Sequence, residues 1–146
     1  MNKQRIIAIL IIPICLLVIV MGVYFIYLYY QSMQRDVQRE QVVEKIIKAL
    51  DNYYKDKQLY PGTPYYYDWH YLITYPEFVS YYDFSQFKDP CAPQKKVGEL
   101  GIVECPGLKV NYRYLGIDCT QEISGCKGYK LTVEFETIGK KEYHSW

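Results

Sequence analysis

The sequence predicts an α+β protein in which a long N-terminal helix packs on a small antiparallel sheet. Three observations support this: an uncharged apolar run at residues 6–30, an amphipathic helical pattern directly after it, and two alternating stretches near the C-terminus. Helix-period and strand-period patterns in separate parts of one chain are typical of the α+β class. We divide the chain into a transmembrane anchor (residues 1–30), a stalk that is the soluble half of the long helix (31–58) and a globular head (59–146).

The apolar run of residues 6–30 has 25 residues and no charged side chain. As a helix it reaches about 37 Å at about 1.5 Å per residue, more than the roughly 30 Å hydrocarbon core of a bilayer. Because backbone polar groups in lipid must bond internally, we expect a single membrane-spanning helix. The residues assigned to this membrane anchor are Ile6, Leu10, Leu17, Val20, Tyr24 and Tyr27.

A cleaved signal peptide is the alternative for this run. Signal peptides have an apolar core of about 7 to 15 residues and a small-residue cleavage site. Here the run is longer and ends in aromatic residues, which suit the headgroup layer of a bilayer. These aromatic residues are Tyr24, Phe25, Tyr27, Tyr29 and Tyr30. We therefore expect the anchor to stay attached.

The stalk is expected to continue the same helix, because residues 31–49 contain neither Gly nor Pro. Apolar residues then recur at three- and four-residue steps and predict a stripe that packs on the head. This stripe comprises Val43, Ile46, Ile47, Leu50 and Tyr54, widened by Val42, Ala49 and Tyr53. A solvated face is predicted for Arg39, Glu40, Glu44, Lys45, Lys48 and Asp51. Pro61 and Gly62 predict that the helix stops by about Gln58.

The first part of the head is predicted to be irregular, because residues 61–96 contain five prolines. Short helical turns are expected around residues 69–73 and 77–81. Tyrosine is unusually frequent, at 18 of 146 residues. Since a tyrosine ring packs while its hydroxyl stays hydrated, two interpretations are open. The tyrosines build the edges of a small core, or the Tyr-rich loop of residues 65–82 is a recognition surface.

Two strands are predicted after this region. Residues 109–115 (KVNYRYL) and 129–137 (YKLTVEFET) alternate β-forming and polar side chains, the pattern of half-buried antiparallel strands. The loop of residues 116–128 would connect them, and residues 101–104 would add a third strand. We expect the tail of residues 140–146 (KKEYHSW) to fray.

The cysteines indicate a disulfide-bonded C-terminal region. Four of them, Cys91, Cys105, Cys119 and Cys126, follow the anchor, and Cys15 lies inside it. An even number at wide spacings is typical of disulfides in an oxidising compartment. Zinc or free thiols are the alternatives, although zinc sites usually use tight pairs such as C-x2-C. We expect Cys91–Cys105 and Cys119–Cys126, which close short loops, while the sequence leaves the pairing open.

The location of the head follows from these cysteines. Lys and Arg residues flank the anchor on both sides and do not choose an orientation. A disulfide framework favours a cytoplasmic N-terminus and a periplasmic or extracellular head. We therefore expect a single-pass protein of the cytoplasmic membrane.

The sequence gives little support for an enzyme. The motifs G-x-S-x-G, H-E-x-x-H, P-loop and G-x-G-x-x-G are absent, and His70 and His144 have no partner at a known spacing. Asp83, Asp89 and Asp118 fall in predicted loops without the spacing of a calcium site. A net charge of +1 provides no basic stripe for nucleic acid. We expect no catalytic residue, metal, cofactor, nucleic-acid partner or small-molecule substrate.

An apolar helix leads into RDVQREQVVEKIIKALDNYYKDKQLYPGT, which contains the pattern "I..AL..YY.D...YP" at its end. With this ending, the stalk resembles the N-terminal spine of type IV pilins and of the pseudopilins of type II secretion. The later YRYLGIDC…GCKGYKLTVEFET is similar to their closing hairpin. The likeness covers the architecture of the whole chain and is specific in residues 35–61. It implies a pilin-like fold and a structural subunit of an envelope filament or secretion machine. Its partners would be the membrane, other pilin-like subunits or an assembly-platform protein.

The chain departs from the pilin pattern in two ways. Prepilins have a glycine-containing cleavage site before the apolar run and a glutamate shortly inside it. MNKQRIIAILII contains neither Gly nor an acidic residue. The resemblance therefore implies an atypical, minor or unprocessed pilin-like protein. The alternative function is a stand-alone membrane-anchored extracytoplasmic binding or adhesion domain that uses the Tyr-rich loop.

Overall fold

The computed structural model describes residues 3–62, 72, 75–83, 89–91, 102–105, 108–120 and 125–145. Side chains are described within these ranges except at residues 3–10, 102–105 and 108–111. The chain divides into two compact units, Met1–Gln34 and Arg35–Trp146, which we describe separately. The elements of the described residues are the helices α1 (Lys3–Lys57) and α3 (Pro76–Val79) and the strands β1 (Ile102–Cys105), β2 (Leu108–Cys119), β3 (Cys126–Phe135) and β4 (Gly139–His144).

The helix α1 confirms the predicted single long helix and its stop near Gln58. Its last residue is Lys57, and Gln58 takes a φ of 60°, the left-handed conformation in which helices commonly end. The chain then turns back. Tyr60 forms an antiparallel bridge with Cys126, with N···O distances of 2.8 and 2.9 Å. The segment after α1 is therefore joined to the first residue of β3.

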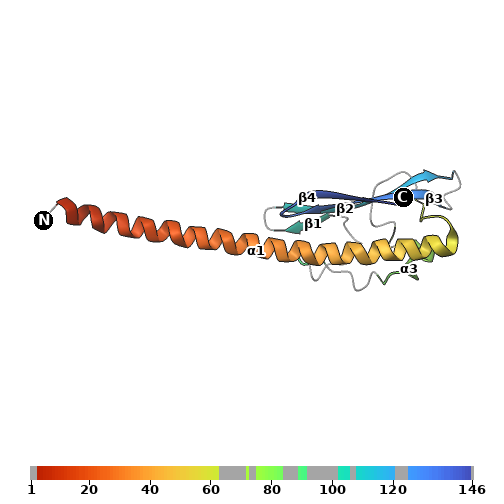
Figure 1. Ribbon diagram of the computed structural model, residues 1–146, viewed down its shortest axis with the longest axis horizontal. Helices are drawn as coiled ribbons and strands as arrows, with labels where there is room; N and C mark the ends of the chain where they lie inside the picture. Colours follow the sequence, from red (N-terminus) through yellow and green to blue (C-terminus); the bar gives the residue numbers. More distant parts are fainter. Residues whose placement is uncertain are drawn as a thin grey trace. The chain divides into compact units, whose positions relative to one another are not determined.

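The strands form an antiparallel sheet in the order β1-β2-β3-β4 (Figure 1). The strand β2 is long enough to pair with two partners in succession. Its first half pairs with β1, from Cys105↔Leu108 to Ile102↔Asn111, and its second half pairs with β3, from Tyr112↔Val133 to Cys119↔Cys126. All three predicted strands are confirmed. The connection predicted at residues 116–128 is shorter than expected, because β2 extends to Cys119 and β3 begins at Cys126.

The prediction of a frayed tail is wrong, because residues 139–144 form β4. This strand pairs with β3 from Phe135↔Gly139 to Lys130↔His144. Gly139 has a φ of +72°, which glycine adopts without steric cost, so the chain can reverse directly after β3. The pairing places Lys130 next to Glu142, with an N···O distance of 2.7 Å. A glycine turn and an opposite-charge strand pair therefore order this tail.

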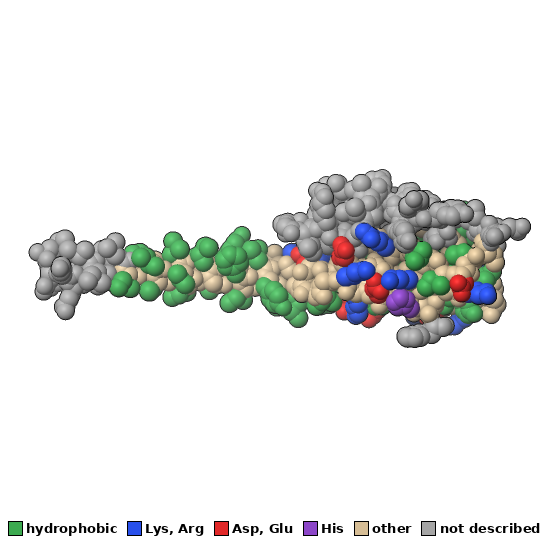
Figure 2. Space-filling model, turned by 90° about the horizontal axis from the view of Figure 1, so that it is seen from above, with side chains coloured by type: hydrophobic (Ala, Val, Ile, Leu, Met, Phe, Trp, Pro, Cys, Tyr) green, Lys and Arg blue, Asp and Glu red, His purple; other side chains and the backbone are tan. Residues whose placement is uncertain are grey.

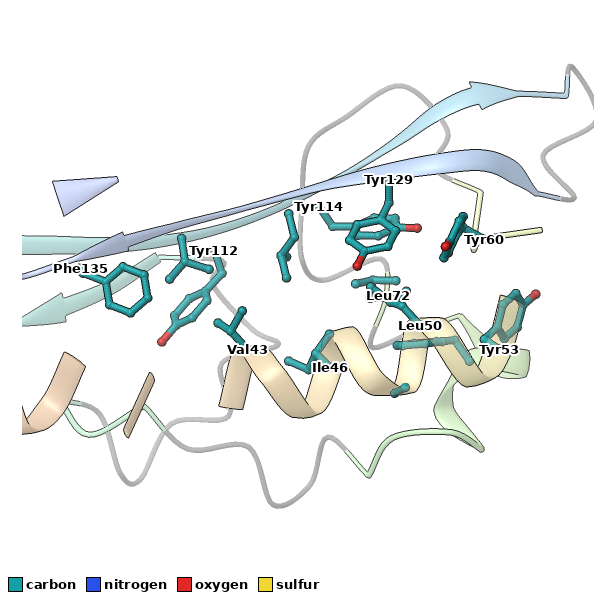
Figure 3. Packing of buried hydrophobic residues seen from close by; sticks show 14 residues of the cluster. Val43, Ile46, Leu50, Tyr53, Tyr60, Leu72, Tyr112, Tyr114, Tyr129 and Phe135 are labelled. Atoms are coloured by element: carbon teal, nitrogen blue, oxygen red, sulfur yellow. The ribbon is translucent and has the colours of Figure 1, made fainter. Parts of the chain in front are cut away.

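The core lies between the second half of α1 and one face of the sheet (Figure 3). Val43, Ile46 and Leu50 point from α1 toward the sheet and are fully buried. The strands contribute alternate residues, as their period-two pattern predicts. These sheet residues are Tyr112, Tyr114, Tyr129, Leu131, Val133 and Phe135. Within the remaining part of the core cluster lie Ala49, Tyr53, Tyr60, Leu72 and Phe78.

The predicted stripe on α1 needs one correction at its C-terminal end. Ile47 is partly buried against the core, as expected of a border position. Tyr54 is 36% exposed and is not part of the core. Its ring instead stacks on Tyr60, with 4.6 Å between ring centroids and 19° between ring planes. Because the chain reverses after Gln58, Tyr60 takes the buried place beside the sheet and Tyr54 lies outside it.

Five of the described tyrosines belong to the core, as the first interpretation expects, whereas Tyr54 and the tyrosines of residues 24–30 are exposed. Tyr53, Tyr60, Tyr112, Tyr114 and Tyr129 are at most 6% exposed. Their rings contact one another in edge and stacked arrangements, such as Tyr60–Tyr129 at 4.9 Å and Tyr114–Tyr129 at 6.0 Å between centroids. Aromatic pairs of this kind contribute about 0.5–1.5 kcal/mol beyond the burial of their area. The predicted recognition loop is described only at residue 72 and from residue 75 onward.

Two further predictions concern the irregular region. The turn expected at residues 77–81 is α3, whose first residue is Pro76, a favoured position for proline. The turn expected at residues 69–73 lies outside the described residues, apart from Leu72, which is fully buried. Asp118 lies in β2 and not in a loop, with a φ of 52° that brings the strand into its turn.

Candidate functional site

The first candidate is the apolar segment, which we define as residues 11–30 of α1. Each of its side chains is exposed, and the large apolar ones range from 39% exposure at Leu28 to 71% at Ile26. Four assigned anchor residues, Leu17, Val20, Tyr24 and Tyr27, are among these exposed side chains. The side chains of the other two, Ile6 and Leu10, lie outside the described set.

An exposed apolar surface of this extent is typical of a membrane-contacting or protein-contacting segment. Figure 2 shows hydrophobic side chains along this segment, whereas charged side chains gather on the second unit. Soluble proteins rarely expose contiguous apolar patches larger than a few hundred Å². The helix is long and apolar enough to be a candidate membrane span. Cys15, exposed within the segment, is a free cysteine.

The second candidate is a group of charged side chains inside the second unit, which we name the Arg39 cluster. It consists of Arg35, Asp36, Arg39, Asp89, Tyr112 and Glu136. Arg39 is at its centre and is fully buried. The prediction that Arg39 lies on a solvated face is therefore wrong. Three carboxylates from separate parts of the chain surround it and replace its hydration.

The guanidinium of Arg39 is bonded on every side. Its Nε and Nη2 donate to the two carboxylate oxygens of Asp89 at 2.9 and 3.1 Å. Its Nη1 donates to Asp36 Oδ1 at 2.8 Å and to Glu136 Oε1 at 2.7 Å. Nη2 also lies 3.1 Å from the sulfur of Cys91. Bidentate pairing with a carboxylate is the strongest geometry available to arginine.

Asp36 connects α1 to the turn between β3 and β4. Its Oδ1 accepts the backbone N–H of Glu136 at 2.9 Å, and its Oδ2 accepts the backbone N–H and the hydroxyl of Thr137, both at 2.7 Å. Arg35 reaches the same turn through Glu136, with N···O distances of 2.8 and 2.6 Å. Lys141 of β4 additionally pairs with Glu40. The start of the second unit is therefore fixed to the β3–β4 turn by charge-assisted bonds.

Asp89 brings a loop and the sheet to the same point. Its side chain is fully buried and accepts the Tyr112 hydroxyl at 2.5 Å and the backbone N–H of Cys91 at 2.8 Å. With the two bonds from Arg39, this carboxylate accepts four hydrogen bonds. Such complete pairing is what allows a charge to be buried, because an unpaired carboxylate in a dry interior costs several kcal/mol.

The pKa values of the cluster follow from burial and neighbouring charge. Burial disfavours the charged form of Arg39, but the bonds to Asp89 and Glu136 outweigh it and raise the pKa of Arg39 above its ordinary value. Burial, followed by the nearby Asp89 charge, raises the pKa of Tyr112 well above its ordinary value. At neutral pH the cluster therefore holds a charged guanidinium and a neutral phenol. Its role is structural, because it connects α1 to Asp89 and to the sheet.

The cysteine predictions are confirmed in part. Cys119 and Cys126 form a disulfide across the paired ends of β2 and β3. Cys91 is also disulfide-bonded, while the side chain of its expected partner, Cys105, lies outside the described set. Among the side chains that the structure describes, no group of three or more His, Cys, Asp or Glu residues is placed to hold a metal ion.

Sequence reasoning missed the Arg39 cluster because its members are far apart in the chain. Arg39 and Asp89 are separated by 50 positions, and Arg39 and Glu136 by 97. The local signal was the Asp36–Arg39 pair at i,i+3 on α1. Such pairs are common on exposed helix faces, so this pair alone does not indicate burial.

Comparisons with protein-family models, with curated proteins and with solved structures found no match for this chain.

Proposed function

We propose that this protein is a pilin-like structural subunit of a bacterial envelope filament or of a secretion or pilus assembly machine. One observation carries the proposal. The exposed apolar segment of residues 11–30 and the packed stripe of the second unit belong to one helix, α1. This arrangement serves a protein that offers one end of a helix to a membrane or to neighbouring helices and uses the other end to organise a head.

The proposed subunit acts through packing and has no catalytic reaction. In the membrane, the segment of residues 11–30 contacts the corresponding segments of other pilin-like subunits or an assembly-platform protein. Outside the membrane, the head provides the surface of the assembly. Helix association in lipid depends on close van der Waals packing, since lipid tails are as apolar as the side chains. The identity of the apolar side chains, and not hydrophobicity alone, should therefore matter.

The proposed location is the cytoplasmic membrane, with a cytoplasmic N-terminus and the head in the periplasm or outside the cell. The Cys119–Cys126 disulfide and the disulfide-bonded Cys91 support a head in an oxidising compartment. The aromatic residues Tyr24, Tyr27 and Tyr30 support a membrane–water interface at the end of the apolar segment.

The test replaces residues 6–30 by an unrelated transmembrane anchor of equal length. If the segment packs specifically, the swapped protein should no longer co-purify with an untagged wild-type copy or with assembly components. It should still be exported with its disulfides formed, and the second unit should melt at the wild-type temperature. These two measurements are the controls for correct folding and location.

Unchanged co-purification and an unchanged envelope phenotype after the swap would contradict a packing role for the anchor. That result would favour the alternative of a membrane-anchored binding domain. The five buried tyrosines lie outside the Tyr-rich loop of residues 65–82, so the surface that this alternative uses is separate from the core.

A further inference from the structure

The disulfide at Cys91 and the Arg39 cluster meet in one short segment. Asp89 and Cys91 are two positions apart, and the backbone N–H of Cys91 donates to Asp89 Oδ1 at 2.8 Å. Nη2 of Arg39 lies 3.1 Å from that same oxygen and 3.1 Å from Cys91 Sγ. One guanidinium nitrogen therefore contacts both the carboxylate and the disulfide sulfur.

We propose that Asp89 protects the disulfide at Cys91 from reduction and that the disulfide in turn holds Asp89 on Arg39. The buried cluster and the disulfide then form one redox-sensitive unit. This proposal concerns the folded second unit and does not depend on the function proposed above.

The charge of Arg39 acts on the sulfur of Cys91 when the disulfide is reduced. With glutathione as the reductant, two glutathione thiols become one glutathione disulfide and the protein S–S bond breaks. The two protein sulfurs take up the two electrons and two protons and become thiols. A cation beside a cysteine stabilises the thiolate that forms when the thiol releases its proton to solvent, and so favours the reduced form at equilibrium. Arg39 is such a cation, and the carboxylates that pair with it oppose this effect: Asp89 through two bonds, and Asp36 and Glu136 through one each. Glu136 Oε1 also lies 3.5 Å from Cys91 Sγ.

The disulfide and the hydrogen bonds of Asp89 also hold residues 89–91 in position. The Asp89 side chain is fully buried and is also held by the Tyr112 hydroxyl at 2.5 Å. Reduction removes the covalent restraint two residues from Asp89, so Arg39 must retain this carboxylate through non-covalent bonds alone. By linkage, whatever the disulfide adds to the Arg39–Asp89 pair, the pair adds to the disulfide.

The electrostatic effect and the positional effect both predict that Asp89→Asn makes the Cys91 disulfide easier to reduce. The substitution removes the negative charge beside Arg39 and weakens the bonds that position residues 89–91. We expect the equilibrium constant for reduction of the Cys91 disulfide to rise by about five- to 150-fold, the usual range for coupled sites. Asp51→Asn, which changes an exposed carboxylate on α1, should leave that constant unchanged.

The experiment uses the full chain in detergent micelles, equilibrated in glutathione redox buffers and quenched by alkylation. Mass spectrometry then gives the reduced fraction at Cys91 and, as an internal control, at Cys119 and Cys126. Tyr112→Phe, which removes one hydrogen bond to Asp89 and keeps the ring, should shift the Cys91 constant in the same direction by a smaller factor. It decides the question if Asp89→Asn does not fold.

A Cys91 constant that stays at the wild-type value in the variants that fold overturns the proposal. An equal rise at the Cys119–Cys126 disulfide also overturns it, because that result means general loosening of the second unit. A rise confined to Cys91 supports it.

Discussion

In residues 11–30 of α1 the apolar side chains are exposed, whereas in the part of α1 that follows Gln34 the largest fully buried side chain is that of an arginine. The two parts share one backbone conformation, so helix geometry does not decide where a side chain lies. The partners decide it. Arg39 has three carboxylates to replace its hydration, whereas the side chains of residues 11–30 are all exposed.

The largest effect is expected from Arg39→Met, which keeps an apolar chain but removes the central cation. Three carboxylates would then share the site with Arg35 alone. Loss of one partner of a buried ion pair costs about 3–5 kcal/mol, and we expect the free energy of unfolding of the second unit to fall by that amount. Urea denaturation measures it. Arg113→Met, at an exposed position of β2, is the matched control and should have little effect.

The same leucine substitution in the two parts of α1 tests the comparison directly. Leu50→Ala removes a fully buried side chain and should lower the free energy of unfolding of the second unit by about 2–5 kcal/mol. Leu17→Ala, at 64% exposure, should leave that value unchanged. Denaturation of both variants in the same detergent is the measurement. Equal effects would show that the two units are stabilised together.

Substitution of a glycine by alanine in each of the two regions should give a smaller difference in stability. A Cβ at Gly116 would lie 2.3 Å from Cys126 Sγ and 2.8 Å from Cys119 Sγ, so Gly116→Ala forces the disulfide or β2 to move. Overpacking of this type costs about 1–3 kcal/mol, measurable as a lower melting temperature of the oxidised protein. A Cβ at Gly22 would meet nothing within 4 Å. Gly22→Ala should therefore not lower the melting temperature.

The smallest effect at neutral pH is expected from ionisation of the buried tyrosines, because it changes the free energy of unfolding only at alkaline pH. Burial raises the pKa of Tyr112 and Tyr114 well above the ordinary value of 10.0, and also raises the pKa of Tyr129. Above pH 10 the unfolded chain loses phenolic protons that the folded chain keeps. Stability is therefore complete below pH 10 and declines as the pH rises beyond it. Tyrosinate absorbance should show these phenols ionising together with unfolding.

A second absorbance result would contradict this picture. If every tyrosine of the second unit ionises near pH 10 while the circular dichroism stays native, the buried phenols have access to water in the folded state. Tyr81, which is only partly buried, provides a more accessible phenol in the same unit for comparison.

The parts of the fold that depend on local pattern were predictable from sequence. A buried helix face is predicted by the three- and four-residue spacing of Val43, Ile46 and Leu50. A buried strand face is predicted by the alternation of Tyr129 and Leu131. The apolar run is likewise recognisable from its own residues, because no distant segment of the chain is needed to identify it. Cys119–Cys126 was the more predictable disulfide, since seven positions separate its ends.

The parts that depend on distant partners were not predictable in this way. Arg39 follows the sequence pattern of an exposed helix residue, and only Asp89 and Glu136, supplied by other elements, make its burial possible. The strand β4 was missed because Gly139 begins a short strand rich in charge, which by itself is typical of a frayed end. Tyr54 fits the helical stripe, but the reversal after Gln58 brings Tyr60 into its place.

The bonds of Asp36 to the β3–β4 turn have a consequence for biosynthesis. The backbone N–H groups that Asp36 accepts belong to residues 100 and 101 positions later in the chain. At a translation rate of about 5–20 residues per second, these residues are made about 5–20 s after Asp36 itself. During that interval the Asp36 carboxylate lacks the partners that it has in the folded protein. The bonds that fix the start of the second unit to the β3–β4 turn therefore form late in the synthesis of the chain.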